Sequence, residues 1–159
     1  MSAPPPIPDL PQPPSGRFAG GVHYYPVRIY FEDTDTGGIV YHANYLRFME
    51  RARSDMLRLM NIDQRGSIES GEGVYTVARI AIDYRMPAYL DDDLIVISHV
   101  LEVGGATCRM DQRVMRGNDI LTNGEVTVAF VSSTGRPKRQ PKPWVALFNR
   151  IAQGESIDS

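Results

Sequence analysis

Residues 32–42 gather the side chains of this chain that are best suited to chemistry. In order, the segment contains Glu32, Asp33, Asp35, the pair Gly37-Gly38 and His42. A carboxylate can act as a nucleophile or as a general base, and a histidine can orient it or tune it. Two glycines allow a sharp turn with a close approach of the backbone. We call residues 32–42 the candidate catalytic loop.

A long helix is predicted directly after this loop, over residues 44–60. Its apolar residues recur at three- and four-residue steps, as Tyr45, Phe48, Met49, Ala52, Met56, Leu59 and Met60. The free amides and the positive dipole end at the start of a helix attract negative charge. They can hold a carbonyl oxygen as it becomes an oxyanion. The sequence therefore places a carboxylate close to amides that suit an oxyanion.

Other interpretations of the same residues stay open. Asp and Asn before a helix are typical caps, and Gly-Gly is typical of a simple turn. The ligand types also fit a metal site built from Glu32, Asp33, Asp35 and His42. However, neighbouring residues of a strand point to opposite sides, and no second histidine stands near. The metal site is therefore the less favoured reading.

The remaining pattern predicts the sheet that positions this loop. Residues 24–32 alternate and are rich in strand-forming residues, and four further strands are expected over 74–86, 94–103, 106–116 and 120–132. Residues 61–73 are expected to be a connection, and Trp144 is expected to anchor the chain end on the sheet. One helix and five strands make an α+β fold in two layers. Exposed sheet edges are usually covered or paired, so we expect a homo-oligomer.

The two ends of the chain differ in character from its middle. Seven of the 12 prolines lie in residues 1–14, and proline fits neither a strand ladder nor a helix interior. Residues 1–21 are thus predicted to be a disordered Pro-rich arm, whose role as a solubilising tail or a docking peptide stays open. Residues 22–148 are predicted to form the domain, and residues 149–159 a flexible C-terminal tail.

Composition excludes several classes of protein. The chain has 159 residues with 17 Lys+Arg and 19 Asp+Glu, so it lacks the positive excess of a nucleic-acid binder. Its sequence shows neither a secretory signal nor an apolar run of membrane-spanning length. The single cysteine, Cys108, fits a reducing compartment, so we expect a cytoplasmic location. We expect Cys108 to be a small buried hydrophobe, and His23 and His99 to be structural.

The block over residues 28–53 carries a family resemblance. It includes Glu-Asp-Thr-Asp-Thr-Gly-Gly at residues 32–38 and Val-Tyr-His-Ala-Asn-Tyr at residues 40–45. It closely resembles the signature of hotdog-fold acyl-CoA thioesterases of the 4-hydroxybenzoyl-CoA thioesterase type. It is most similar to the bacterial subgroup associated with the Tol-Pal cell-envelope system, and the resemblance covers about residues 24–143. It implies a five-stranded antiparallel sheet wrapped around one long central helix. It also implies homodimers joined edge to edge, often paired into homotetramers, with active sites at the dimer interface.

The resemblance also implies roles for particular residues. Asp35 matches the second Asp of the pattern Asp-Thr-Asp-x-Gly-Gly and is implied to be the catalytic carboxylate, with His42 as its partner. Backbone amides around Tyr41 and His42 would face the thioester carbonyl. Substrate-binding contacts are expected from Gly38, Val40, Tyr41 and Tyr45. Thr36 stands where alanine or proline is common in the family, a change that we expect to be harmless.

The implied reaction is hydrolysis of an acyl-CoA thioester to a carboxylic acid and CoA. No cofactor is expected, since coenzyme A is part of the substrate. Whether Asp35 attacks directly or activates a water stays open, as does the preferred acyl chain. The CoA phosphates are expected at Arg136 and Arg139, with Arg85 a weaker candidate, although a solvated basic tail explains residues 135–143 equally well. The same basic surface suits an acidic acyl carrier protein.

Two other functions compete with hydrolysis. One is a hydratase or dehydratase on the same fold, and the other is a non-catalytic module that binds acyl-CoA, an acyl carrier or a Tol-Pal envelope complex. The presence of both Asp35 and His42 favours catalysis. The catalytic hypothesis requires Asp35 to lie near the first turn of the long helix with a groove beside it.

Overall fold

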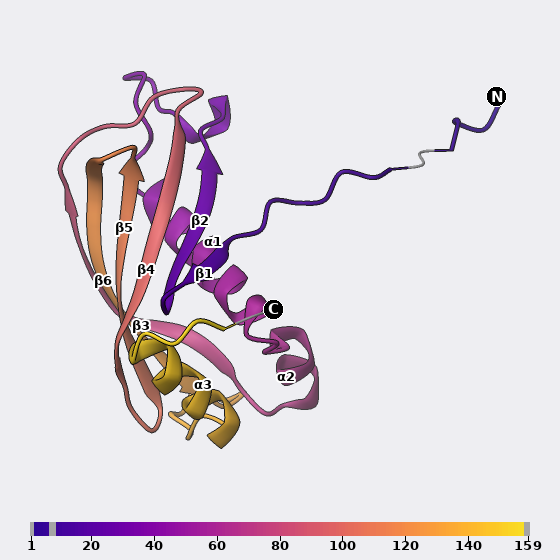
Figure 1. Cartoon of the computed structure of the whole chain (residues 1–159), viewed down its shortest axis with the longest axis vertical. Helices are drawn as coiled ribbons and strands as arrows, with labels where there is room; N and C mark the ends of the chain where they lie inside the picture. The colour runs from indigo at the N-terminus through magenta and orange to yellow at the C-terminus, as the bar shows by residue number, and fades with distance from the viewer. Residues whose placement is uncertain (1, 7–8, 158–159) are drawn as a thin grey trace.

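The computed structural model describes residues 2–6 and 9–157 and contains one antiparallel sheet that curves around a long helix (Figure 1). The six strands lie in the order β1-β2-β4-β5-β6-β3. Their bounds are β1 Arg17–Ala19, β2 Val22–Arg28, β3 Val74–Tyr84, β4 Asp93–Val103, β5 Thr107–Arg116 and β6 Asp119–Val131. The helices are α1 Asn44–Leu59, α2 Gln64–Ser70 and α3 Lys142–Ala152, with a short 3-10 helix, η1, at Phe31–Asp33.

Helix α1 packs on the concave face of the sheet through the apolar stripe that predicts it. Phe48, Met49 and Ala52 are buried there in one core cluster with sheet residues such as Val96 and Leu121. The polar residues of α1 lie mainly off this stripe, so the helix buries one side and leaves the other exposed. The predicted helix over residues 44–60 is therefore confirmed.

The four long strands also lie where their alternation predicts them. Each begins and ends within two residues of its expected bounds. Gly104 donates its amide to the carbonyl of Thr107 at 2.8 Å in the β4–β5 turn. Gly117 has a φ of +58° in the β5–β6 turn, a conformation that glycine adopts without strain.

The sheet has six strands rather than the five expected, because the predicted arm contributes β1. Arg17–Ala19 pair with Val22–Tyr24 across the Gly20-Gly21 turn. The arm prediction is thus wrong for residues 17–21, since three residues are too few to show a strand period. Residues 9–14 extend away from the body of the molecule (Figure 1). Met1, Ile7 and Pro8 of the arm lie outside the described residues, as do Asp158 and Ser159 of the tail.

The flexible tail predicted over residues 149–159 is wrong at its start, because α3 continues to Ala152. Ile151 is only 1% exposed and lies in a second core cluster, which also contains Met56, Val100 and Phe148. The ring of Trp144, in the same helix, lies 5.7 Å from the ring of Phe130 on β6, so its expected anchoring role is confirmed. The prolines around residue 141 indicated only where the sheet ends, although Pro143 begins a helix well.

Two shorter elements depart from expectation as well. The predicted connection over residues 61–73 contains α2, where the Asp63 side chain accepts a hydrogen bond from the Gly66 amide at 3.0 Å. The strand predicted over residues 24–32 corresponds to β2, which ends at Arg28 rather than at residue 32, because η1 begins at Phe31. Across residues 2–6 and 9–157, none of the helices is both long enough and apolar enough to cross a bilayer.

Candidate active site

Asp33 ties the candidate catalytic loop to the start of α1. One carboxylate oxygen accepts the Tyr30 amide at 2.8 Å, and the other accepts the side-chain amide of Asn44 at 2.9 Å. Its backbone carbonyl accepts the amide of Tyr41 at 2.9 Å. Both oxygens of this side chain are therefore engaged in holding the loop. The sequence showed the carboxylate but not this structural role.

Asp35 lies in the tight turn that the two glycines close. Its amide donates to the carbonyl of Ile39 at 2.9 Å, and its carbonyl accepts the amide of Gly38 at 3.0 Å. Gly38 has a φ of +82°, which explains the need for glycine there. Asp35 Oδ1 accepts the Gly37 amide at 2.8 Å, whereas Oδ2 has no hydrogen-bond partner within the described chain. This exposed oxygen is available to a substrate or a water.

The start of α1 carries no side-chain cap. Ala43 occupies the N-cap position, and the first turn contains no acidic residue. The positive end of the helix dipole therefore points toward the loop, where the Asp33 carboxylate contacts the first turn through Asn44. Asp35 stands two residues along an extended segment from Asp33, or about 7 Å, and Asp33 contacts the first turn through Asn44. Asp35 is thus two residues from a side chain that contacts the first turn of α1, and its own proximity to the helix start stays a prediction.

His42 lies on the same loop but is not joined to Asp35. Its ring packs against Tyr41, with centroids 4.6 Å apart, and meets the edge of Tyr84 at 6.1 Å. Its carbonyl accepts the Tyr84 hydroxyl at 2.9 Å. No hydrogen bond or ion pair joins the two side chains in the described residues, and both are exposed. Within this part of the chain, no three His, Cys, Asp or Glu side chains are grouped as metal ligands.

Val40 and Tyr45, two of the expected substrate contacts, are buried supports of the loop. The Val40 amide donates to the carbonyl of Ala88 at 2.9 Å, and the Tyr45 hydroxyl accepts the Ala88 amide at 3.1 Å. Burial raises the pKa of the Tyr45 phenol above its ordinary value of 10.0. Both residues fasten the loop to the segment that precedes β4. Gly38 and Tyr41, by contrast, are exposed.

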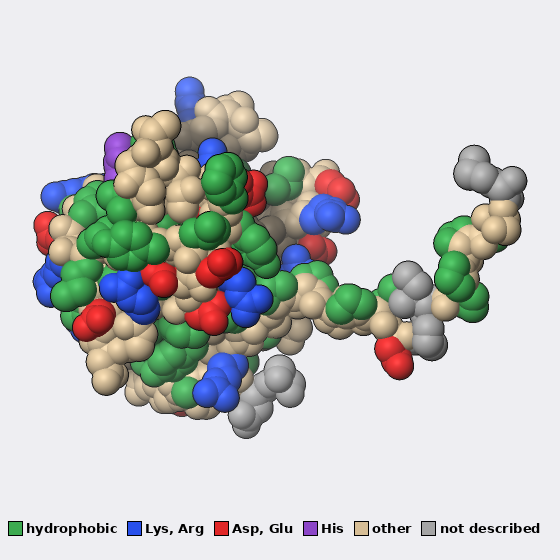
Figure 2. All heavy atoms as spheres, turned by 90° about the horizontal axis from the view of Figure 1, so that it is seen from above, with side chains coloured by type: hydrophobic (Ala, Val, Ile, Leu, Met, Phe, Trp, Pro, Cys, Tyr) green, Lys and Arg blue, Asp and Glu red, His purple; other side chains and the backbone are tan. Residues whose placement is uncertain are grey.

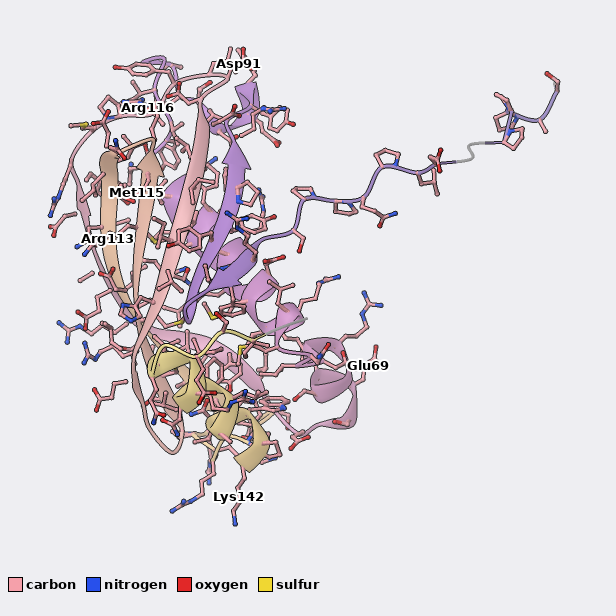
Figure 3. All side chains as sticks on the ribbon, viewed as in Figure 1. Glu69, Asp91, Arg113, Met115, Arg116 and Lys142 are labelled. Atoms are coloured by element: carbon pink, nitrogen blue, oxygen red, sulfur yellow. The ribbon has the colours of Figure 1, made fainter. Side chains whose placement is uncertain are left out.

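The expected phosphate-binding residues are divided between the two ends of the sheet. Arg136 and Arg139 follow β6, whose last residue pairs with Val74 at the start of β3. The loop contacts Tyr84 at the other end of β3, about 33 Å away along the strand. Figure 3 shows the same separation, with Lys142 at one end and Arg116 at the other. Arg85, the weaker candidate, lies at the loop's end.

A cavity of about 340 Å³ opens between α1 and the first half of β3. Its walls are largely apolar and include Met56, Tyr75, Met110 and Phe148, with Glu50 and Arg53 on a polar side. Neither Asp35 nor His42 lines it. The groove expected beside Asp35 is therefore not supplied by this cavity within a single chain.

Large apolar side chains are exposed around the loop. They are Tyr30, Phe31, Ile39, Tyr41, Tyr84, Met86, Tyr89 and Leu90. Figure 2 looks down on this end of the molecule, where hydrophobic side chains lie among Arg, Asp and Glu. Exposed apolar clusters of this kind occur at contact surfaces between molecules more often than elsewhere on a protein's surface.

The expectation that Cys108 is a buried hydrophobe is confirmed. The thiol lies inside the core, and burial raises its pKa to about 12. A thiol with so little thiolate at neutral pH is a poor nucleophile, so the candidate chemistry stays with the loop.

The family model described as the thioesterase superfamily matches residues 37–122, which is more than half of the chain. This chain belongs to the thioesterase superfamily. The match includes Gly38, His42, the whole of α1 and most of the sheet. The family resemblance carried by residues 28–53 is thereby confirmed.

Curated relatives in the superfamily match most of the chain. An acyl-CoA thioesterase YbgC from Haemophilus influenzae is 44% identical over 128 residues, which cover 80% of this chain and 94% of that protein. An acyl-CoA thioester hydrolase YbgC from Escherichia coli is 37% identical over 128 residues, covering 79% and 95%. These relatives support the bacterial subgroup that the sequence resembles.

Solved structures of the superfamily share the fold. A probable thioesterase from Bartonella henselae superposes with a TM-score of 0.72 at 32% identity, covering 76% of this chain and 99% of that chain. A 1,4-dihydroxy-2-naphthoyl-CoA thioesterase from Synechocystis gives a TM-score of 0.74 at 19% identity, covering 83% and 96%. The second likeness bears on the fold alone.

Proposed function

We propose that this chain is an enzyme that hydrolyses acyl-CoA thioesters to a carboxylic acid and CoA, with Asp35 as its catalytic carboxylate. The acyl-CoA thioesterases that are 37 and 44% identical to it support the reaction. The observation that carries the assignment of the residue is the free Oδ2 of Asp35, on the loop that leads into the uncapped start of α1. The neighbouring Asp33, by contrast, has both oxygens engaged in holding the loop.

The proposed chemistry uses groups that the chain itself supplies. A thioester carbonyl is electrophilic, and its thiolate leaves readily, so an activated oxygen and a site for the oxyanion suffice. Asp35 either attacks the carbonyl carbon, giving a mixed anhydride that water then opens, or removes a proton from the attacking water. Amides at the start of α1 stabilise the oxyanion. The exposed ring of His42 can bond the water or the thioester carbonyl.

A second copy of the chain would complete the site. Among the described residues, strand β3 is hydrogen-bonded only to β6, so its outer edge is free there, and Val77 on it is 46% exposed. Antiparallel pairing of two β3 edges sets the Tyr84 half of one protomer beside the Val74 half of its partner. The loop of one protomer then adjoins the cavity of its partner.

The same pairing accounts for the divided basic residues. Arg136 and Arg139 follow β6 at the Val74 end, so those of one protomer approach the loop of its partner. They would bind the phosphates of CoA there, together with Arg85. An acidic acyl carrier protein is the alternative occupant of this basic surface. The reduced, buried Cys108 is consistent with the cytoplasm as the site of the reaction.

A thiol-release assay with purified protein and a panel of acyl-CoA substrates tests the proposal. We expect turnover by the wild type and a loss of about 10³-fold or more in Asp35→Asn, which keeps the shape of the side chain but not its basicity. Glu32→Gln is the matched control, because Glu32 is exposed on the same loop; it should retain activity within about twofold.

Two outcomes would count against the assignment. Near wild-type hydrolysis by Asp35→Asn, with an unchanged melting temperature, would remove Asp35 from the chemistry. Saturable binding of acyl-CoA without thiol release by the wild type would favour the non-catalytic binding module, and repeating the assay with acyl carrier protein thioesters would check that result.

A further inference from the structure

Arg53 is a cation in the wall of the cavity that forms no ion pair within the described residues. Its Nη1 donates to Gln112 Oε1 at 2.7 Å. Among the ion pairs formed within residues 2–6 and 9–157, none includes Arg53. Burial lowers the pKa of the Arg53 guanidinium from its ordinary value, and the charge of Glu50 only partly opposes this effect. The guanidinium is therefore partly desolvated without an anionic partner.

Gln112 holds this guanidinium in place. Gln112 is 0% exposed, and its amide nitrogen donates to the Met49 carbonyl at 3.0 Å and to Ser98 Oγ at 2.9 Å. The reversed amide would set two carbonyl oxygens against each other and an NH₂ group against the guanidinium, so only one orientation is satisfied. The fixed oxygen takes one of the five N–H donors of Arg53, and the remaining donors stay available to the cavity.

The rest of the cavity selects for size and apolar character. Apolar side chains such as Leu57, Val77 and Val128 also line it. Its volume of about 340 Å³ holds roughly ten non-hydrogen atoms if each takes about the 30 Å³ of a liquid water. A plain hydrocarbon chain would fill this space and leave the donors of Arg53 without acceptors. The half-buried Arg53 donors would then lose contact with water without gaining an acceptor, which weakens binding of that ligand.

We propose that Arg53 is a specificity-determining residue, which makes the cavity prefer acyl groups that carry an oxygen acceptor near their far end. The inference rests on the proposed acyl-CoA hydrolysis and names the class of substrate within it. Gln112 is the positioning residue that aims the guanidinium. The acceptor is a terminal carboxylate or a neutral keto oxygen, and Glu50 on the same side of the cavity reduces the advantage of a full negative charge.

Three substrates of matched length test the preference. We would measure kcat/KM for pentanoyl-CoA, 4-oxopentanoyl-CoA and glutaryl-CoA. We expect the wild type to favour at least one oxygen-bearing substrate by about tenfold or more over pentanoyl-CoA. In Arg53→Met, which keeps an apolar stem, this ratio should fall to about one. Arg58→Met is the matched control, because Arg58 is exposed on the same helix and does not line this cavity.

Several outcomes would overturn the inference. A wild type that hydrolyses all three substrates equally well would reject it while leaving the proposed function intact. An equal loss on all three substrates in Arg53→Met and in the milder Arg53→Lys would assign Arg53 a structural role only. If no substrate releases thiol, the proposed function fails, and calorimetric titration of the protein with glutarate and with pentanoate decides the binding preference by itself: tighter binding of glutarate supports it, and equal binding rejects it.

Discussion

Asp33 and Asp35 stand two residues apart, and their hydrogen bonds indicate different roles for the two carboxylates. Asp33 accepts hydrogen bonds from Tyr30 and Asn44, whereas Asp35 keeps one oxygen free. Replacing Asp33 by Ala leaves two donors unmatched, so we expect it to lower the free energy of unfolding by about 1–3 kcal/mol. Urea titration of the variant against Glu32→Ala measures the difference. Equal stability of the two variants would show that the loop does not depend on Asp33.

A second prediction at the scale of the residue concerns pH. His23 is 0% exposed, its Nε2 lies 2.7 Å from Asp55 Oδ2, and its Nδ1 has no partner. Burial lowers the pKa of His23 from 6.5, although Asp55 opposes the effect. As the pH falls, His23 therefore takes up a proton at a higher pH in the unfolded chain than in the folded chain. The free energy of unfolding thus falls as the pH drops below about 6.5.

Comparison of variants isolates this effect. His23→Gln can still donate to Asp55 but does not titrate, so its stability should fall less than that of the wild type between pH 7 and pH 5.5. His99→Gln, at an exposed position, should behave like the wild type. Denaturant titrations at the two pH values provide the measurement, and an equal fall in all three proteins would contradict the role of His23.

At the scale of single residues, only part of the candidate site could be predicted from the sequence. Asp35 and the turn glycines could be identified because their types and spacing are visible in the chain. The engagement of Asp33 and the burial of Tyr45 depend on Tyr30, Asn44 and Ala88, which folding brings together from other segments. Such contacts leave no local pattern, so the sequence could not separate supports of the loop from contacts with substrate.

Among the elements, β1 shows how a segment outside the hydrophobic pattern can be tied to the core. The Gly16 amide donates to Asp55 Oδ2 on α1 at 2.9 Å, and Phe18 packs against the second core cluster. A Cβ at Gly16 would lie 2.3 Å from the Tyr24 carbonyl oxygen, so no side chain fits there without movement.

Two truncations test this element. Removal of residues 1–14 should leave the melting temperature nearly unchanged, because residues 9–14 are exposed. Removal of residues 1–20 should lower it clearly, since it deletes β1 and its contact with Asp55. The single change Gly16→Ala should cost about 1–3 kcal/mol of stability. Thermal unfolding of the three variants provides the measurement, and equal melting temperatures would show that β1 is dispensable.

Periodicity predicted some elements and not others for a physical reason. Helix α1 and the four long strands run for ten or more residues, so their hydrophobic patterns repeat several times. Strand β1 has 3 residues and α2 has 7, too few for a period to emerge. Helix α3 does carry apolar residues at helical steps, as Trp144, Phe148 and Ile151, but the surrounding prolines concealed them.

At the scale of the whole molecule, the free β3 edge predicts a dimer of the 17.8 kDa chain. Ala78→Glu, at an exposed position near the middle of β3 that does not line the cavity, places like charges close together across the two-fold axis and should shift the protein toward the monomer. Light scattering coupled to size-exclusion chromatography measures the mass. The monomeric variant should also lose thioesterase activity, because the loop of one protomer and the cavity of its partner would no longer meet. A fully active monomeric variant would show that one chain suffices.

The opposite edge of the sheet limits how far such assembly can proceed. Beyond Tyr24, β2 has no neighbour on the side of β1, and Pro26 lacks the amide that a further strand would need. Strand β1 itself offers only 3 residues. A dimer that is joined through β3 thus exposes only short, interrupted strand edges. Neither outer edge of such a dimer offers a long, continuous strand for further pairing. The concentrated protein should therefore stay dispersed rather than form amyloid-like aggregates.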